Sequence, residues 1–180
     1  MITIPTLTTE RLTLRAPALS DFDALTAFYA SDRSKFVGGP MTAELTWRQL
    51  ATEIGHWQLR GFGRWIVDET ASGRTIGMVG LWCPEGFPEP EVGWDLFEGS
   101  EGKGYATEAG AAARAYAYGE VGLTTLISLV KPANTPSARV CARLGAWHDS
   151  DFTHERWGAL QVWRHPAPEA LADGGMEAYA

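Results

Sequence analysis

Hydrophobic positions along the chain follow two periods, which together predict a mixture of strands and helices. Residues 11–15 alternate between polar and hydrophobic side chains, which is typical of a half-buried strand. Residues 22–29 instead repeat hydrophobic side chains every three or four positions, which is typical of one helical face. The same patterns predict six further strands, over 64–68, 75–82, 91–96, 126–130, 147–152 and 160–164. They also predict three further helices, over 42–60, 105–118 and 136–144.

The second predicted helix indicates which of its faces is buried. Trp47, Leu50, Ile54 and Trp57 recur at steps of three and four residues. Side chains at these spacings share one face of a helix, so we expect all four to pack into the core.

The order of the predicted elements, β-α-α-β-β-β-α-β-α-β-β, indicates one mixed α/β domain with seven strands and four helices. Its length agrees, because 180 residues are close to the roughly 150 typical of a single domain. Hydrophobic residues form 45% of the chain, enough for an ordinary core. We place the domain at 8–165 and expect 166–180 to be a flexible C-terminal tail.

Charge and cysteine content disfavour several classes of protein. Fifteen Lys and Arg against 22 Asp and Glu give a net charge of −7, whereas a nucleic-acid partner would require a basic face. Cys83 and Cys141 are too few for a disulfide framework, and the four histidines form no cluster with them, so no metal is expected. The chain shows no signal-peptide pattern and no run of about 18 apolar residues, so we expect a cytoplasmic protein without a membrane partner.

One stretch of the sequence is suited to binding a phosphate. After the strand over 91–96, the loop Gly99-Ser100-Glu101-Gly102-Lys103-Gly104 leads into an Ala-rich helix. A helix N-terminus presents unpaired N–H groups and a positive dipole end, and glycines let an anion approach closely. The P-loop motif requires Ser or Thr at the position that Gly104 occupies. The dinucleotide fingerprint requires Gly or Ala at the position of Thr107, so neither motif is present. A plain flexible connection is the alternative for this loop.

Three motifs occur in a fixed order along the chain. They are Arg11-Leu12-Thr13-Leu14-Arg15 followed by Asp21, then Gly102-Lys103-Gly104-Tyr105-Ala106-Thr107-Glu108-Ala109, and then Asn134-Thr135-Pro136-Ser137 with Arg143-Leu144-Gly145 behind it. Together with the element order they resemble the GNAT superfamily of N-acetyltransferases over roughly residues 8–165. The glycine motif is most similar to the branch that includes the ribosomal-protein N-terminal alanine acetyltransferases.

The resemblance implies a single GNAT-like domain whose mostly antiparallel sheet splays apart between its fourth and fifth strands. Acetyl-CoA, the co-substrate, would lie in that gap, with its pantetheine arm along the backbone of Trp94, Asp95 and Leu96. Asn134 and Ser137 would lie at its thiol end. Its pyrophosphate would contact N–H groups of Gly102, Lys103, Gly104, Tyr105, Ala106 and Thr107. The acceptor would be a primary amine, on a peptide or a small molecule. The resemblance is also compatible with a homodimer.

Two positions depart from the family pattern. Glu101 stands where the loop usually opens with Gln or Arg, so that side chain brings no cation, although Lys103 could compensate. Cys141 stands where many members carry the tyrosine that protonates the departing thiolate. The general acid is therefore unassigned, and Ser137 is the better candidate as hydrogen-bond donor to the sulfur. The missing tyrosine also favours an alternative function, a non-catalytic CoA-binding or sensory domain on the same fold.

Glu91 is the candidate general base. Strand alternation places Glu91, Gly93 and Asp95 on one face, and Val92 and Trp94 on the other. If the second face packs into the core, Glu91 points toward the acceptor, where a carboxylate can take the amine's proton. A solvated glutamate at the start of a strand is the alternative.

Overall fold

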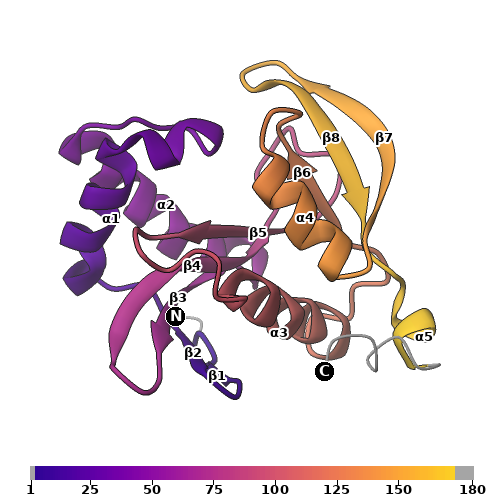
Figure 1. Cartoon of the computed structure of the whole chain (residues 1–180), viewed down its shortest axis with the longest axis horizontal. Coiled ribbons are helices and arrows are strands. Elements are labelled where there is room, and N and C mark those ends of the chain that lie inside the picture. The colour runs from indigo at the N-terminus through magenta and orange to yellow at the C-terminus, as the bar shows by residue number, and fades with distance from the viewer. Residues whose placement is uncertain (1–2, 173–180) are drawn as a thin grey trace.

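The computed structural model describes residues 3–172 and builds them around one eight-stranded sheet (Figure 1). The strands are β1 (Leu7–Thr8), β2 (Leu12–Arg15), β3 (Arg64–Glu69), β4 (Arg74–Trp82), β5 (Glu91–Leu96), β6 (Ile127–Val130), β7 (Trp147–His154) and β8 (Gly158–Arg164). The helices are the 3-10 turns η1 (Leu19–Asp21) and η2 (Asp32–Phe36), and α1 (Phe22–Ala30), α2 (Ala43–Arg60), α3 (Tyr105–Gly119), α4 (Thr135–Arg143) and α5 (Pro168–Ala170). The sheet order is β1-β2-β3-β4-β5-β6-β8-β7, and β5 with β6 is the parallel pair among these strands.

The sheet has one strand more than the seven that the sequence predicts. In the additional strand, β1, Leu7 pairs with Leu14 and Thr8 with Thr13. Two residues are too few to produce a recognisable alternation, so only the pairing with β2 defines this strand. The other seven strands and the four long helices are confirmed to within a few residues at their ends. Of the predicted tail, the described part contains α5, and residues 173–180 lie outside the described residues.

Helices cover both faces of the sheet. On one face Ala113 of α3 is fully buried in a cluster with Val79 of β4. On the other face Met78 of the same strand packs in a cluster with Leu25 of α1 and Leu50 of α2. A strand with helices on both sides buries successive residues, which explains the nearly continuous hydrophobic run of β4.

The buried face of α2 differs from the predicted one. Trp47 and Ile54 were expected in the core, but they are 55% and 42% exposed. The buried residues of the helix are Thr46, Leu50, Glu53, His56 and Trp57. The helix is rotated toward Glu53 because this carboxylate forms a buried ion pair with Arg64 of β3.

The predicted splay between the fourth and fifth predicted strands, β5 and β6, is confirmed. Among the described residues their register is confined to one pair, Glu91 with Ile127. Beyond that pair the two strands diverge, so the C-terminal half of β5 has a free edge. This divergence opens the space in which the candidate site lies.

Candidate active site: the cleft between β5, α3 and α4

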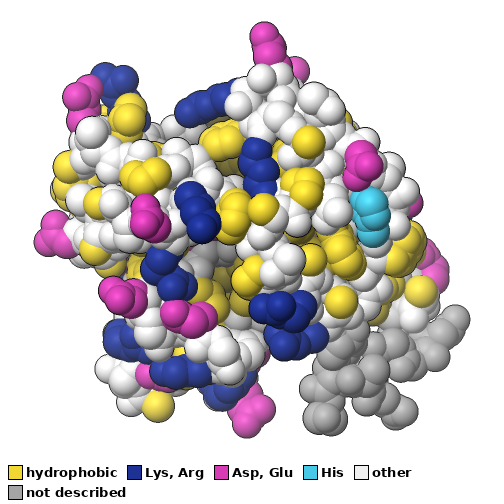
Figure 2. All heavy atoms as spheres, turned by 45° about the horizontal axis from the view of Figure 1, so that its top comes forward, with side chains coloured by type: hydrophobic (Ala, Val, Ile, Leu, Met, Phe, Trp, Pro, Cys, Tyr) yellow, Lys and Arg dark blue, Asp and Glu magenta, His cyan; other side chains and the backbone are white. Residues whose placement is uncertain are grey.

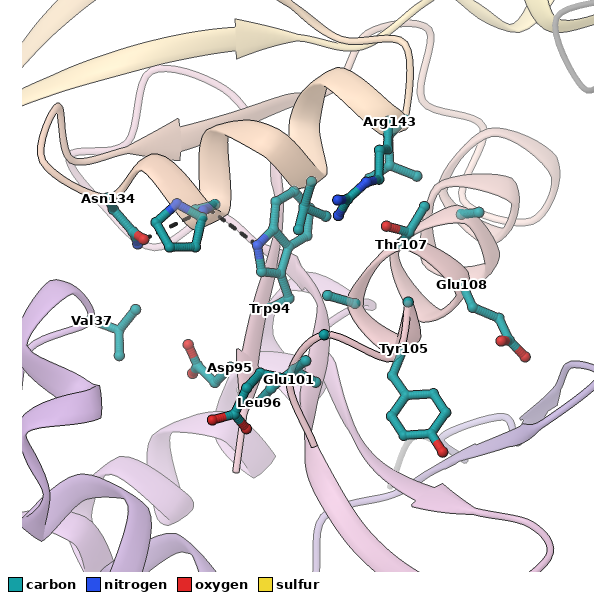
Figure 3. A pocket seen from close by; sticks show the side chains of 18 of the residues that line it. Val37, Trp94, Asp95, Leu96, Glu101, Tyr105, Thr107, Glu108, Asn134 and Arg143 are labelled. Carbon is teal, nitrogen blue, oxygen red and sulfur yellow. Dashed lines mark hydrogen bonds between the residues drawn. The ribbon is translucent and has the colours of Figure 1, made fainter. Parts of the chain in front are cut away.

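A cleft of about 990 Å³ opens where β5 and β6 separate. It is bounded by β5, the glycine loop, the start of α3, one side of α4 and the segment around η2 (Figure 3). Figure 2 shows this face hollowed between the N-terminal helices and α4, with hydrophobic side chains inside and basic side chains at the margin. The predicted cofactor residues that line it are Trp94, Asp95, Leu96, Gly102, Gly104, Tyr105, Ala106, Thr107, Asn134 and Ser137.

Two predicted site residues do not line this cleft. Lys103 is exposed, and its ammonium lies 5.9 Å from the centre of the Tyr105 ring. Glu91 lines a smaller cavity of about 80 Å³ that shares Trp94, Asp95 and Ser137 with the large cleft. The structure therefore places Glu91 beside the cleft and brings the other predicted residues together around it.

The glycine loop has the backbone geometry of an anion site. Gly102 and Gly104 have φ of +76° and +82°, a region that side chains with a Cβ avoid. Gly104 is the N-cap of α3, so the N–H groups of Tyr105 and Ala106 have no carbonyl partner within their own helix. Thr107 adds a buried hydroxyl that has no hydrogen-bond partner within residues 3–172. An anionic oxygen at the start of α3 would satisfy these groups.

Arg11 ties the opening strand to this loop. Its Nη1 donates to the Lys103 carbonyl at 3.0 Å, and its Nη2 lies 2.6 Å from the carboxylate of Glu108. The first sequence motif is thus adjacent to the second in space, and Arg11 places a cation at the cleft margin. Arg11 belongs to the first sequence motif, but no sequence pattern indicates its contact with Glu108, because the two residues are far apart along the chain.

Glu101, which stands where the family usually has Gln or Arg, binds a second cation at the loop. Arg33 of η2 donates from Nη1 to the Glu101 carboxylate at 2.8 Å and from Nη2 to the Leu96 carbonyl at 3.1 Å. Arg33 also lines the cleft, so the acidic loop residue holds an arginine from another element there. Arg143 of α4 lies at the same cleft and points toward Thr107 (Figure 3).

The start of α4 forms the end of the cleft nearest to Glu91. Asn134 is the N-cap of α4, and its side-chain oxygen accepts from the Ser137 N–H at 3.4 Å. The Ser137 hydroxyl oxygen accepts from the Trp94 indole N–H at 3.2 Å, the bond drawn in Figure 3. Because that oxygen is the acceptor, the hydroxyl proton of Ser137 stays available for a ligand.

Cys141 lies on the opposite side of α4. It is fully buried in a cluster with Val130 and Ala146, and burial raises the pKa of its thiol to about 12. Cys141 lines neither of the two cavities. These surroundings indicate that Cys141 is a small residue of the core.

Glu91 lies at the point where β5 and β6 begin to separate. One carboxylate oxygen accepts from the Leu129 N–H at 3.0 Å, and the other lies 4.0 Å from where a Cβ on Gly93 would be. Burial raises the pKa of Glu91 to about 7, and the Leu129 N–H and the positive charge of Arg64 oppose the rise. A carboxylate that titrates near neutrality and borders a cavity has the properties of a general base.

A buried ion cluster forms one wall of the small cavity. Arg64 pairs with Glu53 of α2 and, at 2.9 Å, with Asp95 of β5. Burial in this cluster raises the pKa of Asp95, while Arg64 opposes the rise. Asp95 was predicted to contribute through its backbone, and the ion cluster was not predicted, since no local pattern relates positions 53, 64 and 95.

Comparison with known proteins decides the family. A family model described as an acetyltransferase (GNAT) domain matches residues 11–146. The chain belongs to the GNAT acetyltransferase family. A curated relative, the uncharacterized N-acetyltransferase p20 of Bacillus licheniformis, is 30% identical over 139 residues, which are 75% of this chain and 78% of the relative. The resemblance drawn from the three motifs is confirmed.

Solved structures have the same fold. An acetyltransferase from Agrobacterium tumefaciens str. C58 has a TM-score of 0.84 at 42% identity, covering 92% of this chain and 96% of that one. A ribosomal-protein alpha-N-acetyltransferase, RimL, in complex with coenzyme A has a TM-score of 0.75 at 15% identity, covering 89% and 97%. The GNAT family uses acetyl-CoA, so the co-substrate class follows from membership. Within residues 3–172, no acidic, His or Cys cluster could hold a metal, and no helix has the length and hydrophobicity to cross a membrane.

Proposed function

We propose that this protein transfers the acetyl group of acetyl-CoA directly to a primary amine while both substrates are bound. One observation carries the proposal: Glu91, whose pKa burial raises to about 7, lines a small cavity that opens onto the same residues as the cleft, and the cleft extends to the N–H groups at the start of α3. The first feature is required to deprotonate an amine and the second to hold a phosphorylated co-substrate. The acceptor is a peptide N-terminus or a small-molecule amine.

The residues of the cleft fit coenzyme A. The N–H groups at the start of α3 and the unpartnered Thr107 hydroxyl match the oxygens of a pyrophosphate, and Arg11, Arg33 and Arg143 place positive charge at the same cleft. The free edge of β5 offers backbone groups to the amides of a pantetheine arm. When bound, the co-substrate supplies the activated acetyl thioester.

Two side chains of the protein, Glu91 and Ser137, would then act in the transfer, one by accepting a proton and one by donating a hydrogen bond. Glu91 accepts a proton from the acceptor ammonium, so that the neutral amine can attack. Ser137 directs its hydroxyl proton to the sulfur end of the cleft, because its oxygen already accepts from Trp94. Neither step requires a covalent enzyme intermediate.

The experiment that tests this proposal measures coenzyme A release across a library of primary amines. We expect release with at least one amine, and Glu91→Gln should lower kcat by about a hundredfold or more. Glu98→Gln is the matched control, because Glu98 is an exposed carboxylate just after β5 that lines neither cavity. Equal kcat values in the two variants would remove Glu91 from the mechanism.

A CoA-binding or sensory domain without turnover is the second candidate, and the burial of Cys141 favours it. This cysteine replaces the family's thiolate-protonating tyrosine and cannot reach the cleft. Binding of coenzyme A with no release from acetyl-CoA by any amine would support this second function. The Ser137→Ala variant separates the two further, since loss of kcat with unchanged coenzyme A binding requires a catalytic role for the hydroxyl.

A further inference from the structure

Lys131 is a basic residue of the small cavity that the proposed chemistry does not use. It follows the last residue of β6 and lines the same 80 Å³ cavity as Glu91 and Ser137. Its ammonium donates to the main-chain carbonyl of Trp157, in the turn between β7 and β8. An ammonium has three N–H donors, so this bond leaves two of them for another partner.

The charges around the cavity leave Lys131 without an anionic partner. Arg64, the other cation there, is neutralised by Glu53 and Asp95. Lys131 forms no ion pair with any carboxylate in the described part of the chain, Glu91 included. A half-buried cation is costly when no anion compensates it, so the site favours a ligand that brings a negative charge.

The cavity is also confined on its outer side. The Trp157 ring lies so close to Gly38, between η2 and α2, that a Cβ at Gly38 would come within 2.7 Å of it. The turn that holds Lys131 therefore meets the segment that carries Phe36 and Val37, both of which line the cavity. This contact favours a short acceptor over a chain that continues outward.

Glu91 and Lys131 line the same small cavity, so one small molecule can contact both side chains. The Glu91 carboxylate accepts from the Leu129 N–H, and the Lys131 ammonium donates to the Trp157 carbonyl, so each group is held at the cavity by its own main-chain partner. A molecule that carries an amine and a carboxylate on the same or adjacent carbon atoms brings one group for each of these two side chains.

We propose that the acetyl acceptor is an amino acid or a similar small amine whose carboxylate is bound by Lys131 while its amine faces Glu91. This inference rests on the proposed function, because it names the acceptor of the same site. It makes Lys131 the residue that selects a free amino acid over an amine without a carboxylate.

The test compares acceptors that differ in the carboxylate alone. Coenzyme A release is measured with the L-amino acids and with their carboxamides, for the wild type and for Lys131→Met. We expect the wild type to have a kcat/KM at least about tenfold higher for the best amino acid than for its carboxamide, as a charge-assisted hydrogen bond implies. In Lys131→Met this preference should fall to about one, mainly through KM for the amino acid.

Lys35→Met is the matched control, because Lys35 of η2 is exposed and lines neither cavity. It should keep the wild-type preference. A wild type that acetylates both acceptor types equally, or a Lys131→Met variant that keeps the preference, would overturn the inference while leaving acetyl transfer intact. Release with neither acceptor type nor any other amine would contradict the proposed function itself. Thermal unfolding of each variant verifies that it folds.

Discussion

Replacing Glu91 by Gln should make the protein more stable at pH 8 while it slows the reaction. Burial raises the pKa of Glu91 from 4.5 to about 7, so the folded state holds this proton more tightly than the unfolded state does. Between pH 4.5 and 7 the unfolded state therefore loses the proton first, and this carboxyl lowers the stability as the pH rises. Glutamine has no proton to lose and can still accept from the Leu129 N–H with its side-chain oxygen.

The size of this gain follows from the shift in pKa. Each pKa unit corresponds to about 1.4 kcal/mol, so the full shift from 4.5 to about 7 sets an upper bound of about 3.5 kcal/mol. The side chain is partly exposed, which screens the charge, and we therefore expect about 2 kcal/mol at pH 8. For a domain of this length that is a rise in Tm of roughly 4–8 °C.

The assay is thermal unfolding of wild type, Glu91→Gln and Glu98→Gln at pH 4.5 and pH 8. The difference between wild type and Glu91→Gln should be small at pH 4.5 and should reach its full size at pH 8. Glu98→Gln should show no such pH dependence, because its carboxylate is exposed. If Glu91→Gln gives the same Tm difference at both pH values, Glu91 is not a buried carboxyl of raised pKa, and the reasoning for its role as base is wrong.

Five further outcomes are expected. Coenzyme A at a hundredfold excess over its Kd should stabilise the fold by about 2.7 kcal/mol, and calorimetry that shows no shift in Tm would count against the cleft as its site. Gly104→Val should raise the KM for acetyl-CoA strongly, because Gly104 has a φ of +82° at the anion site, whereas Gly119→Ala, at an open helical position, should not. Asn134→Ala should weaken binding of the thiol end of the cofactor instead. If both Asn134→Ala and Gly104→Val leave the kinetics with acetyl-CoA unchanged, the cleft is not the cofactor site. Cys141→Ala should keep kcat within about twofold and lower the stability by about 1 kcal/mol, and a loss of rate at constant coenzyme A binding would make the thiol catalytic after all. Burial lowers the pKa of His165 to about 3, so the wild type should lose stability as the pH falls from 6.5 toward 3, and His165→Gln should lose less over the same window.

Features that depend on neighbours along the chain can be predicted from the amino-acid sequence. The strand alternation, the glycines before α3 and the hydrophobic spacing of the long helices are local, because a residue's backbone preference and its nearest hydrogen bonds are set within a few positions. Of the predicted cofactor residues that line the cleft, seven lie in the glycine motif and the Asn134 motif, whereas Trp94, Asp95 and Leu96 followed from the family resemblance. The sequence did not show that Arg11 touches the glycine loop. Local patterns thus predicted the elements, their order and a candidate anion site.

Which charged side chains pair with one another depends on the fold. Hydrophobic spacing predicted a core position for Ile54 of α2, whereas the fold buries Glu53 because Arg64 approaches it from β3. In the same way Glu101, which leaves the loop without its usual cation, gains Arg33 from 68 positions away. The pKa of Glu91 likewise depends on the point where two strands diverge. Burial and ion pairing act through space over a few ångströms, so residues far apart in the sequence determine them, and no periodicity along the chain records that proximity.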